Sequence, residues 1–239
     1  MKIALGTRAA LACVLFILAA LPASTRAQTA QPIRTIYLVR HGAYLPDPKA
    51  NPQSGPGLST LGIAQARLIG TRFRSMRVAF DTLTSSMMTR AQQTAAIVHE
   101  QIADVPASSS PLLSECTPPA RVQLRDPPAS LSACKERFDA AFAKYFTPAT
   151  GTDRNDILVC HGNVIRYLTT KALGVDSGAW VAMSVAHTSV TIVQVLGNGV
   201  FRVIAVGDIG HVPATLQSWG DDADPNLVAP ATDRINIER

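Results

Sequence analysis

Arg40 and His41 are the neighbouring pair of side chains in this sequence best suited to chemistry. They follow a β-branched and apolar run, residues 35–39, which predicts a buried strand. Open α/β sheets place their ligands at the carboxyl ends of such strands. A guanidinium can donate two hydrogen bonds to a phosphate, and an imidazole beside it can attack the phosphorus. The pair therefore indicates phosphoryl transfer, although a surface Arg-His pair at a strand end also fits these two residues alone.

Two further residues follow predicted strands in the same way. Arg90 lies in the first turn of a helix that begins soon after the strand ending in Thr84-Ser85-Ser86, and a helix amino terminus favours phosphate. His161 directly follows a third strand-like run. Taken singly, a solvated helix arginine and a structural histidine are the ordinary interpretations. Three strand ends of one sheet that carry these types together favour a functional site.

Predicted strands and helices alternate along most of the chain. We expect strands at residues 35–39, 80–84 and 156–160, and helices at 59–75, 88–102, 132–146 and 163–173. Residues 43–57 are expected to form an active-site loop, and 106–130 a Pro- and Ser-rich crossing. Two alternating runs, 189–196 and 200–206, flank Gly197-Asn198-Gly199 and predict a hairpin. The fold class is therefore α/β: a three-layer sandwich with a mainly parallel sheet, an antiparallel edge hairpin, and helices on both faces.

The composition suits a globular domain and gives no sign of a nucleic-acid partner. Of 239 residues, 47% are hydrophobic and 16% are charged, which is enough apolar material for a core. The formal charge is +5, but Lys2, Arg8 and Arg26 lie in the first 27 residues without an acid. The remainder has 19 basic and 17 acidic side chains, and a net +2 is too small to predict nucleic-acid binding.

The first 27 residues have the pattern of a signal peptide. Lys2 and Arg8 precede a 13-residue apolar run, which Pro22 ends, and small residues fit a cleavage site before Gln28. A membrane-spanning helix needs about 20 apolar residues, so we expect cleavage and a periplasmic or secreted protein. Contact with the membrane is expected only if the leader stays uncleaved. The predicted parts are the leader at 1–27, one domain at 28–218 and a loose tail at 219–239.

Export affects how the cysteines are interpreted. Cys116, Cys134 and Cys160 lie beyond the leader, in a chain expected to meet an oxidising compartment. Cys160 ends an apolar run and should pack as a small buried hydrophobe. Cys116 and Cys134 either form a disulfide worth about 3 kcal/mol or remain thiols, and the sequence leaves both open. Their spacings match no zinc-site pattern.

The motifs around these residues resemble the histidine phosphatase superfamily, which has the phosphoglycerate-mutase-like fold. The segments that carry the resemblance are Leu-Val-Arg-His-Gly at 38–42, Ser-Ser-Met-Met-Thr-Arg-Ala-Gln-Gln-Thr at 85–94 and Cys-His-Gly-Asn at 160–163. Residues 159–168 are most similar to the branch of mitochondrial serine/threonine-protein phosphatases. The resemblance covers about residues 34–215, and it makes 28–218 a histidine phosphatase domain.

The resemblance implies a role for each candidate residue. His41 would be the nucleophile that forms a phosphohistidine, while Arg40, Arg90 and His161 would hold the phosphoryl oxygens. Glu115 would protonate the leaving oxygen and then activate water, although an ordinary loop carboxylate is the alternative.

Two positions depart from the pattern of relatives. His187 stands where they commonly carry Asn, and would either donate to the phosphate or cap its loop. Ala43-Tyr44 replaces the Glu-Thr of many members, which leaves the substrate contacts open. The resemblance implies no metal and no cofactor.

The resemblance and the leader point to different substrates. The branch implies phosphoserine or phosphothreonine in protein, whereas export suits an envelope phosphosugar such as the lipopolysaccharide core. A phosphoglycerate mutase would use the same residues, but its substrates are cytosolic. A catalytically idle phosphate-binding scaffold is the alternative from a different class.

Overall fold

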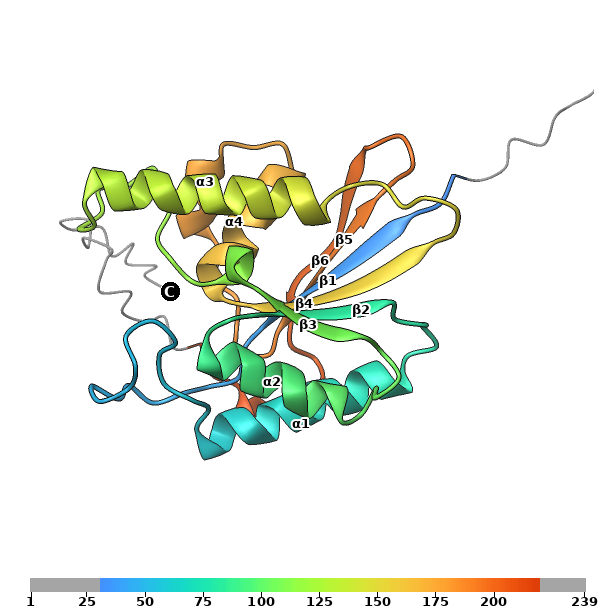
Figure 1. Ribbon diagram of the computed structural model, residues 1–239, viewed down its shortest axis with the longest axis horizontal. Helices are drawn as coiled ribbons and strands as arrows, with labels where there is room; N and C mark the ends of the chain where they lie inside the picture. Colours follow the sequence, from blue (N-terminus) through green and yellow to red (C-terminus); the bar gives the residue numbers. More distant parts are fainter. Residues whose placement is uncertain (1–30, 220–239) are drawn as a thin grey trace, which may run out of the picture. The chain divides into compact units, whose positions relative to one another are not determined.

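The computed structural model describes residues 31–219, and within them a six-stranded sheet carries helices on both faces (Figure 1). The strands lie in the order β3-β2-β4-β1-β5-β6. β1 (Arg34–Arg40), β2 (Thr82–Ser86), β3 (Ala107–Ser110) and β4 (Arg154–Cys160) are parallel, while β5 (Val190–Val195) and β6 (Phe201–Asp208) form the antiparallel hairpin. The predicted fold class is confirmed. The predicted leader, and the predicted tail beyond residue 219, lie outside the described residues.

The helices divide between the two faces of the sheet. α1 (Thr60–Ser75) and α2 (Thr89–His99) cover one face, and α3 (Pro128–Tyr145) and α4 (Gly162–Ala172) cover the other (Figure 1). Because side chains alternate along a strand, β1 supplies Tyr37 and Val39 to the core under α1 and α2, and Ile36 and Leu38 to the core under α3 and α4. No helix between residues 31 and 219 is both long enough and apolar enough to cross a membrane.

Some predicted element bounds were wrong. β2 begins two residues later than expected, because Phe80 packs its ring against Tyr37 and Phe73 before the strand starts. α2 ends at His99 instead of 102, and α3 begins at Pro128 instead of 132, with proline in its first turn. The crossing at 106–130 contains β3, whose Ala-Ser-Ser-Ser sequence has little strand propensity. Pairing with β2 overrides that propensity.

The disulfide alternative is the one that the structure contains. Cys116 and Cys134 are bonded, with a Cα–Cα distance of 5.8 Å, and Cys160 is a buried free thiol as expected. The bond attaches the segment after the short 3₁₀ helix Pro111–Leu113 to α3. It therefore fixes the chain one residue beyond Glu115.

α1 and the turn after β1 touch backbone to backbone. The Ser59 side chain accepts a hydrogen bond from the Gly62 amide and caps α1, while its own amide donates to the Ala43 carbonyl at 2.9 Å. A Cβ at Gly62 would lie 2.0 Å from the Ala43 oxygen, and one at Gly42 would lie 2.5 Å from the Gly62 oxygen. Glycine at both positions lets the turn that follows His41 rest on the first turn of α1.

Gly62→Ala should therefore destabilise the protein, by about 1–3 kcal/mol of unfolding free energy, because rigid backbone must move to admit the methyl group. Gly70→Ala in the same helix is the matched control. Its Cβ would lie 3.0 Å from the flexible Gln101 side chain, and alanine favours a helix, so this change should be close to neutral. Chemical denaturation measures both variants. Equal stability of the two would contradict a close backbone contact at Gly62.

Candidate active site

Three strand ends bring the predicted residues together. The His41 amide donates to the Cys160 carbonyl at 3.0 Å, which continues the pairing of β1 with β4 by one residue. The His41 and His161 ring centroids are 5.0 Å apart, and Arg90 Nε donates to His41 Nε2 at 3.1 Å. Arg40, His41, Arg90 and His161 are all buried. The structure thus gathers the four residues predicted to form the phosphate site.

His41 is held as a neutral imidazole. Its Nδ1 lies 2.8 Å from the Gly42 carbonyl, which can only accept, so Nδ1 carries the hydrogen. Nε2 accepts from Arg90 and therefore has the lone pair. Burial lowers the pKa of His41 well below its ordinary value, and the charges of His161, Arg40, Arg90 and His187 lower it further. An unprotonated Nε2 is the form that can act as a nucleophile.

The two arginines are fixed by their surroundings. Arg40 Nη1 donates to the carbonyls of Val185 at 2.7 Å and Trp219 at 2.5 Å. Arg90 lies in the first turn of α2, and burial lowers its pKa. The Tyr44 ring lies 4.8 Å from Arg90 Cζ and 5.6 Å from the His41 ring. Tyr44, where the sequence departs from relatives, is therefore a side chain of the site that sequence reasoning left without a role.

His161 depends on a serine that sequence reasoning also missed. Its Nε2 lies 2.8 Å from Ser86 Oγ, which accepts from the Met88 amide at 3.1 Å. Burial, followed by the charges of Arg90 and Arg40, lowers the pKa of His161 well below its ordinary value. Within residues 31–219 its Nδ1 has no hydrogen-bond partner. The available signal for Ser86 was its place as the last residue of the strand before Arg90.

Glu115 belongs to the same site. Its Oε2 accepts from the amide of Asn163 at 3.4 Å, in the first turn of α4, and its Oε1 is out of contact with solvent and unbonded in the described part of the chain. Burial raises its pKa to about 7, outweighing the opposite effect of Arg166, Arg90 and Arg40. At neutral pH this carboxyl group can hold a proton and release it, as a general acid must.

The carboxyl group is positioned from two sides. Asn163 Nδ2 donates to the Cys116 carbonyl at 3.0 Å, so one residue of α4 contacts both Glu115 and its neighbour. The bond between Cys116 and Cys134 attaches the same segment to α3. The disulfide that sequence left open therefore lies directly beside the predicted acid.

His187 reaches the site through a strained turn. Thr188 has a φ of 56°, a left-handed conformation that costs a β-branched residue energy, and its amide donates to the carbonyls of Arg40 at 3.1 Å and His41 at 3.3 Å. His187 Nδ1 lies 2.9 Å from Ser218 Oγ, and its ring centroid is 5.5 Å from that of His41. Burial lowers its pKa to about 3. The ring thus contacts its own loop and also lies beside the predicted nucleophile.

The charges and hydrogen-bond donors of these residues suit an anion with more than one oxygen. The site combines the buried guanidinium groups of Arg40 and Arg90 and three imidazoles with a carboxyl group that is neutral or singly charged. Such a site matches the charge and the donor requirement of a phosphate dianion. Among residues 31–219 no three His, Cys, Asp or Glu side chains are placed to hold a metal ion.

A groove of about 650 Å³ is lined partly by chain neighbours of the site residues. Ser114, which precedes Glu115, lines it on one side. Ser54, whose carbonyl accepts from the Thr89 amide at 2.9 Å, lines it on another. The remaining lining residues are Gln53, Met87, Pro111, Leu112 and Arg137. Most of this wall is apolar or uncharged, and Arg137 is its charged side chain.

Comparison with known proteins agrees with this geometry. The sequence profile of the histidine phosphatase superfamily (branch 1) matches residues 36–118 and 117–208. The mitochondrial serine/threonine-protein phosphatase Pgam5 of Caenorhabditis briggsae is 34% identical over 187 residues, which cover 75% of this chain and 64% of that protein. The corresponding protein of Xenopus laevis is 34% identical over 195 residues, covering 76% of this chain and 67% of its own length. The chain thus spans about two thirds of these relatives.

A solved structure shows the same fold. Phosphoglycerate mutase from Plasmodium falciparum aligns with a TM-score of 0.55 and 23% identity, over 77% of this chain and 96% of that one. The profile match includes Arg40, Arg90 and His161. Sequence profile, relatives and fold agree, and this chain belongs to the histidine phosphatase superfamily (branch 1).

Proposed function

We propose that this protein is an exported phosphomonoesterase that works through a phosphohistidine at His41, without a metal ion, on phosphoserine or phosphothreonine in proteins. The observation that carries the proposal is the pair formed by His41 and Glu115. One is a buried imidazole with its lone pair on Nε2, and the other a buried carboxyl group with a pKa of about 7. A nucleophile without a proton and an acid with one are what the first half of the reaction requires.

The reaction proceeds in two steps. In the first, His41 Nε2 forms a bond to phosphorus while the bond to the leaving oxygen breaks, and Glu115 gives its proton to that oxygen. In the second, Glu115 takes a proton from water, the water oxygen bonds to phosphorus, and the bond to Nε2 breaks. Arg40, Arg90 and His161 stabilise the charge on the equatorial oxygens in both steps.

Protein substrates are supported by the groove and by the relatives. The groove of about 650 Å³, which Ser114 next to Glu115 in the chain lines, has room for several residues of a peptide. The relatives at 34% identity are named serine/threonine-protein phosphatases. The leader-like first 27 residues favour a second candidate, an envelope phosphosugar.

His41→Ala should abolish turnover, because the proposed reaction passes through a bond between His41 Nε2 and phosphorus. The measurement is phosphate release from an aryl phosphate, phosphopeptides and phosphosugars in excess chelator. His99→Ala is the control, since His99 Nε2 donates to the Val105 carbonyl of its own loop, away from the site. Substantial activity in the His41 variant would contradict the phosphohistidine proposal. Loss of wild-type activity in excess chelator would contradict the proposal that no metal ion is needed. The substrate ranking decides between protein and phosphosugar.

Glu115→Gln should slow the hydrolysis of alkyl phosphates by about 10²–10⁴-fold. It should slow the hydrolysis of aryl phosphates much less, since a good leaving group needs little protonation. In the wild type, kcat/KM for alkyl phosphates should fall as pH rises through about 7, because Glu115 then loses its proton. Activity should extend into the acid range, because His41 stays neutral there. Glu100→Gln, at the exposed end of α2, is the matched control. Equal losses on both substrates would remove Glu115 from the role of acid.

Export is tested on the full chain expressed in a Gram-negative host. We expect to find the protein in the fraction released by osmotic shock. Its mass should be that of a chain that begins at Gln28. A chain that keeps residues 1–27 and stays with the cytosolic or membrane fraction would contradict export and leave the catalytic proposal untouched.

A further inference from the structure

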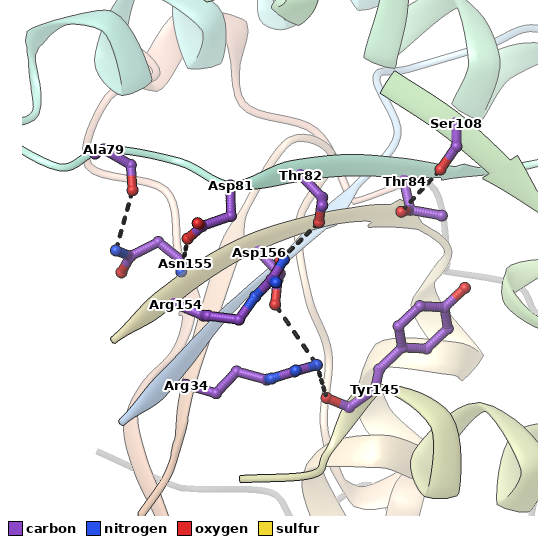
Figure 2. Close-up of polar contacts among 10 residues, drawn as sticks. All are labelled: Arg34, Ala79, Asp81, Thr82, Thr84, Ser108, Tyr145, Arg154, Asn155 and Asp156. Carbon is purple, nitrogen blue, oxygen red and sulfur yellow. Dashed lines mark hydrogen bonds and ion pairs between the residues drawn. The ribbon is translucent and has the colours of Figure 1, made fainter. Parts of the chain in front are cut away.

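A second cluster of charged and hydroxyl side chains lies at the amino-terminal ends of the parallel strands. Arg34, Thr82 and Arg154 are the first residues of β1, β2 and β4, whose carboxyl ends lead to the active site. Figure 2 shows both arginine side chains directed toward Asp156 on β4. Because these strands are parallel, the cluster and the active site lie at opposite ends of the same strands.

Positive charge exceeds negative charge in this cluster. Asp156 is 6% exposed, and its Oδ1 accepts from Thr82 Oγ1 at 2.7 Å and from Arg154 Nη2 at 3.2 Å. Its Oδ2 lies 3.7 Å from Arg34 Nη1. Lys144, near the end of α3, borders the same space and pairs with no carboxylate between residues 31 and 219. The residues that line this space thus carry three positive charges and one negative charge, a net +2. Asp81 and Asp153, at the same strand ends, are outside the lining and accept from the backbone amides of Asn155 and Ile33.

The cluster surrounds a cavity of about 310 Å³. Its remaining lining residues are Thr84, Ser108, Ser109, Ser110 and Tyr145. Thr84 Oγ1 and Ser108 Oγ are 3.2 Å apart on neighbouring strands (Figure 2). On β1 and β4 the same face carries the buried Ile36 and Leu158, whereas β2 and β3 carry hydroxyl groups here. A row of hydroxyls on a sheet face suits a polar occupant better than a packed helix.

Buried polar atoms without a partner gather at this cavity. Within residues 31–219, Arg34 Nε, Arg154 Nε and Tyr145 Oη are out of contact with solvent and make no hydrogen bond. The candidate active site has the same property at Glu115 Oε1 and His161 Nδ1. Buried polar groups in native proteins are nearly always bonded, so groups left unpaired in one place require an explanation. A bound ligand with several oxygen atoms would give the atoms at this cavity their missing partners.

We propose that this cavity binds a small anionic polyol. Its phosphate or carboxylate would lie between Arg34, Arg154 and Lys144, where a guanidinium can offer Nε and a terminal nitrogen to two oxygens. Its hydroxyl groups would bond to the Thr84 and Ser108 side chains. The volume suits a molecule the size of a sugar phosphate or a sugar acid. This site is separate from the catalytic one, and the proposal does not depend on the reaction assigned there.

The test is calorimetric titration of the full chain carrying His41→Ala and Arg90→Gln, which prevents turnover and removes an arginine from the active site. The probes are gluconate, glucose 6-phosphate and glucose. We expect at least one anionic probe to bind with a Kd of about 1 mM or tighter, and glucose about tenfold more weakly. Adding Arg154→Gln should raise the Kd of the anionic probe by about tenfold or more. Which of the two anions binds tells phosphate from carboxylate.

Arg154→Gln is expected to fold, since its side chain is 36% exposed, and thermal unfolding checks this. If it fails to fold, Lys144→Gln, on an exposed side chain at the same cavity, takes its place with the same expectation. Thr84→Val removes one hydroxyl group. It should weaken the binding of the anionic polyol and leave the binding of inorganic phosphate unchanged. The proposal is overturned if neither anion binds, if glucose binds equally well, or if the cavity variants leave the affinity unchanged.

Discussion

The parallel pairing of β1 with β4 is the constraint on which the site depends. Arg40 pairs with Cys160 in register, and the hydrogen bond from the His41 amide to the Cys160 carbonyl carries the pairing one residue further. His41 and His161, 120 residues apart in the chain, therefore lie side by side where the two strands end. A shift of one residue would turn His41 to the opposite face of the sheet. The close contact of Gly42 with Gly62 and the strained turn at Thr188 hold this strand end against α1 and the β5 side of the sheet.

The protonation states of the site follow mainly from burial. Desolvation favours neutral forms, so His41 and His161 lose their protons and Glu115 keeps its own. The arginines stay charged, and Arg40 donates to the carbonyls of Val185 and Trp219. Burial thus leaves a neutral nucleophile beside guanidinium groups that keep their charge. In the proposed reaction these groups would attract the phosphoryl oxygens.

Sequence was enough for the parts of this site that follow strand ends. Strand patterns and residue types located Arg40, His41, Arg90 and His161, and the hairpin around Gly197-Asn198-Gly199 was equally readable. Other parts depend on contacts that no local pattern encodes. β3 is a strand only because β2 pairs with it, and Ser86 matters only because His161 lies 2.8 Å away.

Glu115 lies between these two cases. A lone glutamate in a loop has no signal of its own, and a likeness to relatives was needed to select it. The pKa of about 7 comes from burial that only the assembled structure creates. The disulfide could not be decided from spacing either, since a bond requires two Cβ atoms within reach, and here α3 supplies that proximity.

Distance makes the two ends of the sheet electrostatically independent. Arg34 and Arg40 are the first and last residues of β1, and six residues of strand at roughly 3.3 Å each separate them by about 20 Å. Ile36 and Leu38 lie between them, buried in the core under α3 and α4. None of the charged groups that line the Arg154 cavity is among those that shift the pKa of His41 or Glu115, so a charge change there should hardly alter either pKa. Any effect of one end on the other would have to pass through movement of the strands, and the apolar side chains packed on both faces oppose such movement.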